Sequence, residues 1–464
     1  MKNLVWLRQD LRLSDNPALY HAASQGELIV IYIYDTENPA QYKLGGASKW
    51  WLRHSLKSLI ADFKKHDIQL IIKKGDPFKI LTELIDAENI TALYYNRCYE
   101  PFAIKRDTKI KQELAIEVNS YNASLLYEPW QIKNGQGQFF KVFTPFWKAC
   151  LNFATPEEPL ETPDLKAATH QQKSLTVNEL DLLPKNPDWS VGFDKQWQVG
   201  EQAAQDKLHN FLDTGLKNYA TERDLPAEVN GTSILSPHLH FGEISSRQIF
   251  QAVKFHEELH PAKDTSYSIK RYVAELGWRE FSYYLLYHFK ELPEQAFNKK
   301  FSNFPWQNDK NHLQAWRKGL TGYPIVDAGM RQLWQSGWMH NRVRMIVASF
   351  LTKHLLIDWR LGAEHFYDCL LDADLASNSA SWQWVAGSGA DAAPYFRIFN
   401  PIMQSKKFDS NGEYIKKWVP ELAHLDTKYL HEPWLYEGEL DYPKPLVEHF
   451  FARDRALQTY QKIK

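Results

Sequence analysis

The chain has 464 residues, of which 44% are hydrophobic and 24% are charged, and this length and composition allow two or three packed domains. Its formal net charge of -1 excludes a chain that is basic throughout, so contact with a nucleic acid requires a local basic face. No apolar run is long enough to span a membrane, no signal peptide precedes the first strand, and the three cysteines lack metal-ligand spacing, so we expect a cytoplasmic protein without a bound metal or a structural disulfide.

Short β-rich runs alternate with amphipathic stretches over the first part of the chain. Ser14, Asp15 or Asn16 can cap a helix that begins at Pro17, and a Gly-Asp-Pro turn precedes a helix that begins near Phe78. Alternating strands and helices predict a parallel sheet covered on both faces, so we expect the first 130 residues to form a doubly wound α/β domain. The expected strands are residues 4–7, 28–34, 69–73 and 92–96.

The loop after the first expected strand carries no glycine-rich phosphate-binding motif. Arg8, Asp10 and Arg12 alternate there instead, which argues against a nicotinamide dinucleotide site. Gly45 and Gly46 precede an amphipathic stretch and are compatible with either a phosphate cradle or an ordinary turn. The α/β fold therefore offers a ligand crevice without indicating its ligand.

The alternating pattern ends in a connector. Residues 131–196 include a proline-rich, polar stretch, which predicts a long segment that runs over the surface. From residue 197 the periodicity is helical, and its longest runs cover residues 266–289 and 327–356. We therefore expect residues 197–464 to form a separate, mainly α-helical domain.

Two groups of polar side chains in the first part of the helical half are candidate ligand contacts. Thr232, Ser233 and Ser236 place hydroxyl groups at a turn before a helix, where they can bind a phosphate or cap the helix. Glu275 and Trp278 lie three positions apart on one helix face. They form either a pair that holds a nucleobase or a surface acid beside a core tryptophan.

A second helical run places polar residues on two faces. Asn341 and Arg344 share one face, and Arg342 and Met345 share another. This helix can therefore offer one polar face to a cofactor and the other to a substrate. Arg344 is also a suitable partner for Asp372, because a buried acid needs a cation.

Residues 372–404 concentrate acids, amides and tryptophans. Trp382 and Trp384 are two positions apart, so on a helix their rings point in different directions and can serve two different sites. Asn378 follows Asp374 by one helical turn. The alternative is a helix capped by an acid, with the tryptophans as core packing.

Several long strings in the chain are more specific than any single motif, namely LVWLRQDLRLSDNPAL, TGYPIVDAGMRQLWQSGWMHNRVRM, DLASNSASWQW and DAAPYFRIFNP. They resemble the DNA photolyase/cryptochrome family, specifically the bacterial class I photolyases for cyclobutane pyrimidine dimers. The resemblance covers essentially the whole chain and implies an α/β antenna domain followed by a helical domain that binds FAD in a bent conformation. The implied activity is light-driven DNA repair, in which excited FADH⁻ passes an electron to the dimer and the cyclobutane ring opens.

The resemblance implies an FAD pocket in which Asn378 faces the flavin N5. Photolyases have Asn at this position, whereas plant cryptochromes have Asp. An amide can hydrogen-bond the reduced flavin without adding a negative charge beside it. The implied FAD contacts are Tyr219, Thr232, Ser233, Leu235, Ser236, Arg279, Asn341, Arg344, Asp372, Asp374 and Asn378.

The resemblance also implies UV-damaged DNA as the partner, with a dimer that leaves the duplex and enters a pocket beside the flavin. Glu275 would hydrogen-bond the dimer. Met345 stands where photolyases for (6-4) photoproducts have histidine, which argues against that activity. The implied dimer and DNA contacts are Arg223, Glu275, Trp278, Asn341, Arg342, Met345, Trp384, Arg397, Gln404, Lys406 and Lys407.

Three further tryptophans gain a role from the resemblance. Trp382, Trp359 and Trp306 match the family's chain that carries an electron from the surface to an oxidised flavin. Without the resemblance, each of the three would be taken as a core residue. As a matched set, they predict electron transfer.

The antenna chromophore is left open by the sequence. Phe102 and Ala103 stand where folate-binding members of the family have an Asn-Glu pair, and Leu292 and Pro293 stand where those members have a Cys-Lys pair. The expected folate contacts are therefore missing at both places. A deazaflavin-type antenna, a differently placed folate and no antenna are the three alternatives.

A cryptochrome, a blue-light receptor without repair activity, is the alternative function within the family. Asn378, Met345 and Trp384, together with the lack of a long tail after the last helical stretch, favour the repair enzyme. We expect that enzyme to act as a monomer, without an obligate protein partner and without a membrane.

Overall fold

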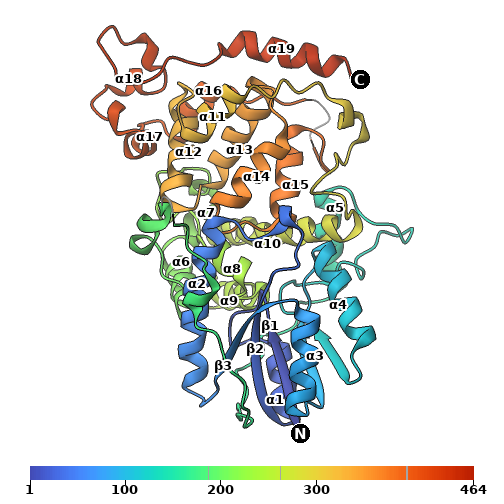
Figure 1. Cartoon of the computed structure of the whole chain (residues 1–464). Coiled ribbons are helices and arrows are strands. Elements are labelled where there is room, and N and C mark those ends of the chain that lie inside the picture. Colours follow the sequence, from blue (N-terminus) through green and yellow to red (C-terminus); the bar gives the residue numbers. More distant parts are fainter. Residues whose placement is uncertain (186–187, 262, 393–395, 464) are drawn as a thin grey trace.

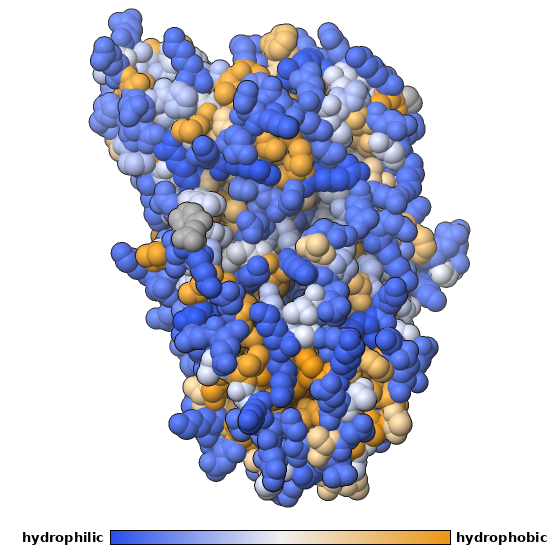
Figure 2. Space-filling view, viewed as in Figure 1, coloured by the Kyte–Doolittle hydropathy of each residue, from blue (hydrophilic) through white to orange (hydrophobic). Residues whose placement is uncertain are grey.

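A computed structural model describes residues 1–185, 188–261, 263–392 and 396–463. An α/β part lies at the bottom of Figure 1 and a helical part lies above it, with helix α10 (Lys263–His288) lying across the middle of the molecule. Hydrophilic residues cover most of the face in Figure 2, and hydrophobic residues gather over the lower α/β part. No helix of the described residues is both long and apolar enough to span a membrane.

The sheet has five parallel strands in the order β3-β2-β1-β4-β5. In register, Val5 of β1 pairs with Val30 of β2 on one side and with Tyr94 of β4 on the other. The order reverses direction at β1, which makes the carboxyl ends of β1 and β4 the expected ligand crevice. The strands are β1 Lys2–Leu7, β2 Glu27–Asp35, β3 Leu70–Gly75, β4 Ala92–Asn96 and β5 Glu117–Tyr121.

Helices cover both faces of this sheet, which confirms the doubly wound α/β fold. The side chain of Asn16, one of the three expected alternatives, caps α1 by accepting from Leu19 N, and Asp76 caps α3 by accepting from Phe78 N. Pro17 and Pro77 begin these helices because their fixed φ suits a first turn. The helices of this part are α1 Pro17–Gln25, α2 Gly46–Lys64, α3 Pro77–Glu88 and α4 Pro101–Glu113, with the 3₁₀ turn η1 Ala40–Tyr42.

The glycine pair at the start of α2 serves close packing. A Cβ at Gly45 would lie 2.3 Å from the carbonyl oxygen of Tyr367, and the amide of Gly46 donates to Asp368 Oδ1 at 2.8 Å. A carboxylate of the helical part therefore occupies the N terminus of α2. Of the two sequence interpretations, the turn agrees with the structure and the phosphate cradle does not.

The stretch expected as a connector passes along the sheet and contains one helix that the sequence did not indicate. Leu28 forms an isolated parallel bridge with Ala167, and Leu175 N donates to Ile72 O at 2.9 Å. Helix α5 (Phe143–Phe153) then packs against α10. The remaining regular segments are the 3₁₀ turns η2 Val177–Leu180 and η3 Trp189–Lys195.

The helical part confirms the mainly α-helical expectation. Its helices are α6 Glu201–Thr214, α7 Tyr219–Glu222, α8 Ser236–Phe241, α9 Ser246–Leu259, α10 Lys263–His288, α11 Lys310–Lys318, α12 Pro324–Ser336, α13 Asn341–Ser349, α14 Trp359–Cys369, α15 Leu375–Ala386, α16 Pro401–Phe408, α17 Glu413–Trp418, α18 Thr427–Leu430 and α19 His449–Gln461. Its other turns are the 3₁₀ segments η4 Leu216–Asn218, η5 Lys299–Asn303, η7 Pro420–Leu422 and η8 Pro433–Leu435, and the π-helical turn η6 Phe350–His354.

The long helical run expected over residues 327–356 is interrupted. Gly337 ends α12 with a φ of 67°, and a Cβ at that position would lie 2.7 Å from Leu371. Glycine adopts this left-handed conformation without steric cost, so the chain turns there and restarts as α13 at Asn341. The break turns α13 away from the line of α12.

Buried polar contacts join the α/β part to the helical part. Arg12 Nη1 donates to Gly242 O at 2.9 Å, and Arg247 Nη2 pairs with Asp15 Oδ1 at 2.8 Å. Gly242 has a φ of 67°, and a Cβ there would lie 2.0 Å from Gln9 O. The two parts therefore approach each other at a point where only hydrogen fits.

Gly242→Ala is expected to lower the free energy of unfolding by roughly 1–3 kcal/mol, because it adds both left-handed strain and a clash with the Gln9 carbonyl. Denaturant unfolding of the whole chain measures the change. Gly135→Ala is the matched control, since no heavy atom lies within 4 Å of a Cβ at that position. Equal stability of the two variants would contradict the close approach.

Candidate functional site

A cavity of about 540 Å³ opens between α10, α13 and α15. Its volume falls in the range of small-molecule and cofactor sites. The walls combine acids, arginines, amides and aromatic rings with small residues such as Ala380 and Ser381. Residues selected from the sequence that line it are Arg223, Glu275, Trp278, Asn341, Arg342, Arg344, Met345, Asp372, Asn378, Trp382 and Trp384.

A buried ion pair lies in the wall of this cavity. Arg344 Nη2 on α13 pairs with Asp372 Oδ2 at 2.8 Å, as the sequence predicted, and Ser236 Oγ at the start of α8 donates to the same oxygen at 2.5 Å. The other carboxylate oxygen, Asp372 Oδ1, is buried and has no hydrogen-bond partner among the described residues. A buried acceptor without a partner is costly, so this atom fits a hydrogen-bond donor on a ligand in the cavity.

The first turn of α15 orients two further polar residues. Asp374 caps the helix by accepting from Ser377 N at 2.6 Å and also accepts from the hydroxyl of Tyr283. Asn378, one turn later, lines the cavity and donates from Nδ2 to Ala363 O at 3.0 Å. The amide of Asn378 is therefore held in a fixed orientation at the cavity wall.

Two indole rings from different helices line the same cavity. Trp278 on α10 is 36% exposed and stacks on Phe143 of α5, with ring centroids 3.8 Å apart and planes 9° apart. Trp384 on α15 donates from Nε1 to Asp391 O at 3.1 Å. Phe143 also lines the cavity, and the sequence gave no signal for it because it lies in the expected connector.

Carboxylates neutralise two further arginines at this cavity. Arg223 Nη1 forms an ion pair with Glu275, and Arg342 Nη2 pairs with Asp224 Oδ1 at 2.9 Å. Burial lowers the pKa of His340 to about 4, so its ring is neutral near pH 7 and Nδ1 accepts from Arg342 N. Two of the cations expected to contact phosphate are thus already paired.

A depression of about 560 Å³ adjoins the cavity and shares Arg342 and Met345 with it. Three more of the expected DNA contacts, Arg397, Gln404 and Lys407, line this depression. Lys406 does not, because its ammonium group pairs with Glu432. The expected DNA contacts therefore lie in one continuous region made of the cavity and the depression, except for Lys406, which lies to the side of it.

Some of the expected cofactor contacts lie outside the cavity wall. Tyr219 is buried against Tyr272, and Arg279 donates to Ser124 O at 2.7 Å. The loop before α8 carries Ile234 at a φ of 52°. Ser236 does not line the cavity but donates a hydrogen bond to Asp372, which does. The expected cofactor contacts that do not line the cavity are Tyr219, Thr232, Ser233, Leu235, Ser236, Arg279 and Asp374.

Two family models match the chain. Residues 3–164 match the model described as DNA photolyase, and residues 272–462 match the FAD binding domain of DNA photolyase. A deoxyribodipyrimidine photo-lyase of Agrobacterium fabrum (strain C58 / ATCC 33970) is 46% identical over 99% of this chain and 98% of its own length. The chain belongs to the DNA photolyase family.

Cryptochromes and solved photolyases lie within the same range of similarity. Cryptochrome-2 of Arabidopsis thaliana is 37% identical over 98% of this chain and 78% of its own length. A solved class III photolyase from Agrobacterium tumefaciens has a TM-score of 0.95 at 46% identity and covers 100% of this chain and 97% of that one. These findings confirm the expected family, its enzyme class and its FAD cofactor. They do not support the narrower expectation of class I, since the solved relative is described as class III.

Of the three tryptophans matched to the family's electron chain, two are buried and one is half-buried. Trp382 on α15 is buried and lines the cavity, Trp359 at the start of α14 is buried, and Trp306 is half-buried. Among the described aromatic pairs, Trp382 is in ring contact with Trp316 (6.3 Å between centroids) and Phe366 rather than with Trp359. Sequence reasoning missed Trp316, because neither spacing nor motif set it apart.

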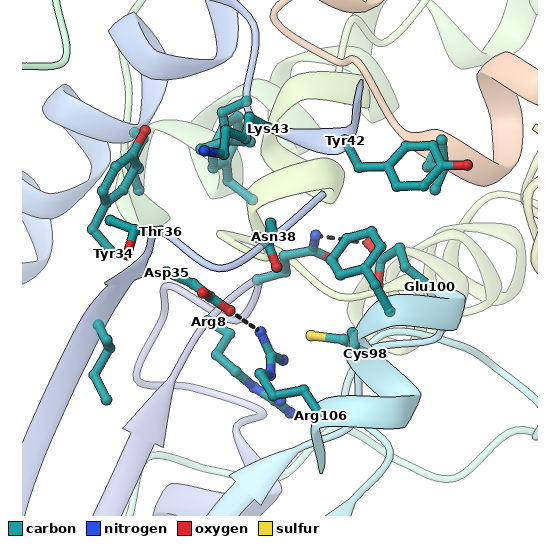
Figure 3. A pocket seen from close by; sticks show the side chains of 18 of the residues that line it. Arg8, Tyr34, Asp35, Thr36, Asn38, Tyr42, Lys43, Cys98, Glu100 and Arg106 are labelled. Atoms are coloured by element: carbon teal, nitrogen blue, oxygen red, sulfur yellow. Dashed lines mark hydrogen bonds and ion pairs between the residues drawn. The ribbon is translucent and has the colours of Figure 1, made fainter. Parts of the chain in front are cut away.

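A second cavity of about 220 Å³ lies at the carboxyl ends of β1, β2 and β4 (Figure 3). Its charged groups are largely paired, since Arg106 binds Asp35 at 2.8 Å and Arg8 binds Asp107. Burial raises the pKa of Cys98 there to about 12, so its thiol stays neutral near pH 7. This crevice occupies the switch point of the sheet, where the family's antenna domain is expected to hold a ligand.

Asp372→Asn is expected to weaken FAD binding by about tenfold, because it leaves the Arg344 guanidinium without its carboxylate partner. Flavin absorbance per mole of purified protein, followed through dilution and dialysis, measures the loss. Asp224→Asn is the matched control, since it removes a carboxylate from Arg342 and not from Arg344. Equal flavin retention in both variants would contradict a cofactor role for the Asp372 pair.

Proposed function

We propose that the chain is a light-driven photolyase that repairs cyclobutane pyrimidine dimers in DNA. One observation carries the proposal: two indole walls, Trp278 and Trp384, line the same cavity as the Arg344–Asp372 pair and Asn378. A site for two linked pyrimidine rings and a site for a charged, hydrogen-bonding cofactor would therefore be continuous. Continuity matters because electron transfer to a dimer requires the cofactor and the dimer to be close.

Asp372, Arg344, Asn341 and Asn378 would hold the cofactor. Asp372 Oδ1 would accept a hydrogen bond from the flavin, which would satisfy a buried acceptor that has no partner among the described residues. Asn378 presents an amide where a carboxylate would repel negative charge. Reduced FAD, when bound, would supply the light-excited electron that opens the cyclobutane ring and would take the electron back after the ring has split.

The chain's own residues would receive and orient the dimer. Trp278 and Trp384 would contact its two pyrimidine rings, and the energy gained there offsets the few kcal/mol needed to bring the dimer out of the duplex. Glu275 would accept a hydrogen bond from the N3–H of a thymine. Arg223 pairs with Glu275 Oε1, and a DNA phosphate that binds Arg223 instead would leave the whole Glu275 carboxylate available to the dimer.

Binding to the DNA backbone would use the rim of the cavity. Arg342, Arg397 and Lys407 line the adjoining depression, and each phosphate contact releases counterions. The rim therefore gives a local basic face to a chain of net charge -1. We also propose that the protein works as a monomer in the cytoplasm, because none of these steps calls for a second chain.

The repair assay separates a photolyase from a receptor of the cryptochrome type. The chemically reduced protein is illuminated with a duplex that carries one thymine dimer, and restored thymine absorbance is followed against a dark control. We expect restoration in the light alone. An FAD-loaded protein that restores no absorbance would favour the receptor and end the repair proposal.

Trp306→Phe is expected to block photoreduction of oxidised FAD while leaving repair by chemically reduced enzyme unchanged. Phenylalanine keeps an aromatic ring beside Phe304 but is much harder to oxidise than an indole. Flavin absorbance under blue light with a thiol donor measures photoreduction. Trp334→Phe replaces another half-exposed tryptophan that the electron chain does not use and serves as the control. Loss of both activities in Trp306→Phe would contradict the electron-transfer assignment.

A further inference from the structure

Asp391 lies in the turn that follows α15 and has a backbone conformation that few residues tolerate. Its φ is 55°, in the left-handed region, and the residue is half-buried. Asn and Asp adopt this conformation more readily than other non-glycine residues, yet it costs free energy that surrounding contacts must offset. Its contacts therefore indicate why the strain persists.

The carboxylate of Asp391 holds the start of α5. Phe143 is the first residue of that helix, and its backbone N–H donates to Asp391 Oδ2 at 3.2 Å. Val142, at the N-cap, has no side chain that could cap the helix. A carboxylate from a distant turn thus supplies the acceptor that the local sequence lacks, at the positive end of the helix dipole.

The backbone carbonyl of Asp391 holds the other side of the cavity. It accepts the indole N–H of Trp384 at 3.1 Å. The side chain of Asp391 therefore reaches α5 while its carbonyl reaches α15, and the left-handed turn allows both. A conformation with negative φ would redirect one of the two acceptors.

Phe143 transmits the position of α5 to the opposite wall. Its ring is buried and lies face to face with Trp278 at 3.8 Å, closer than most aromatic pairs. A second contact to Phe281 on α10, at 6.0 Å and 66°, fixes the tilt of the Phe143 ring. The Phe143 ring thus sets the plane of the Trp278 indole, and Asp391 holds the backbone of Phe143.

We propose that Asp391 is a positioning residue for dimer recognition, because it fixes both indole walls of the cavity relative to each other. The inference rests on the proposed function. One residue contacts the Trp384 indole directly and the Trp278 indole through Phe143. The separation and tilt of the two rings then depend on a single turn, and a dimer fits between them without first having to order them.

Two substitutions of Asp391 separate its side-chain contact from the strain of its backbone. Asp391→Gly removes the carboxylate and relieves the strain, whereas Asp391→Asn keeps an acceptor and the tolerance of positive φ. The measurement is the ratio of dissociation constants, in the dark, for an undamaged duplex and the same duplex with one thymine dimer. Both dissociation constants are calculated from the concentration of protein that carries FAD.

We expect Asp391→Gly to lower this ratio by about tenfold. The ratio for Asp391→Asn should stay within about twofold of that of the parent protein. Phe143→Leu removes the stacked ring and is expected to lower the ratio by a similar factor. The double variant Phe143→Leu/Asp391→Gly should lose less than the product of the two single factors, because both act on Trp278. Affinity for undamaged DNA should stay unchanged in all variants, and FAD content should stay unchanged in the two Asp391 variants.

Each other outcome has a defined meaning. A parental ratio in folded Asp391→Gly overturns the inference, and so does a loss of ratio that parallels a loss of FAD, since that indicates a general structural role. If Asp391→Gly fails to fold, a parental ratio in Phe143→Leu overturns the inference on its own. A parent protein with no preference for the dimer would remove the proposed function, and the inference with it.

Discussion

The ion pair between Arg344 and Asp372 is the interaction on which the rest of the helical part depends. It joins α13 to the segment that precedes α15, and Ser236 ties the start of α8 to the same carboxylate. A buried carboxylate requires such partners, since its desolvation is otherwise uncompensated. These two helices carry Asn341, Asn378 and both tryptophans of α15, so the pair sets the distance between the walls of the cavity. One carboxylate oxygen has no partner among the described residues, so in the proposed function the pair would contact the cofactor as well as join the helices.

Ion pairs at the mouth of the cavity explain how a chain of net charge -1 can present cations to an acidic polymer. Arg223 pairs with Glu275 and Arg342 with Asp224, while Lys406, to the side of the adjoining depression, pairs with Glu432. These pairs are partly exposed, so exchanging a carboxylate for a phosphate costs little. In the proposed function, the basic face would form by exchange of partners when DNA binds. The same exchange would free a carboxylate inside the cavity, which would couple backbone binding to contact with the damaged bases.

Helix periodicity and apolar strands were predictable, whereas contacts between distant segments were not. The four expected strands are apolar and buried, but β5 (EVNSY) is polar at the sheet edge and was missed. The run expected over residues 327–356 broke at Gly337, because a left-handed C-cap outweighs continuous periodicity. In the site, spacing on one helix predicted which residues share a face, and Arg344 does meet Asp372. Phe143 and Asp391 lie far apart in sequence, and no local pattern could join them to the tryptophans.

Helix α15 shows why a two-residue offset between tryptophans is useful. Trp382 is buried against Phe366 and Trp316, while Trp384 is half-buried and bonds the turn that follows the helix. Both rings line one cavity, yet they contact different neighbours. A substitution next to one ring can therefore change the position of that ring without moving the other. Gly362 allows this arrangement, because a Cβ there would lie 2.2 Å from the Trp382 ring. A larger residue at that position would push Trp382 toward the cavity and narrow the space proposed for the cofactor. The glycine on α14 therefore sets the width of the site as much as the aromatic residues that line it.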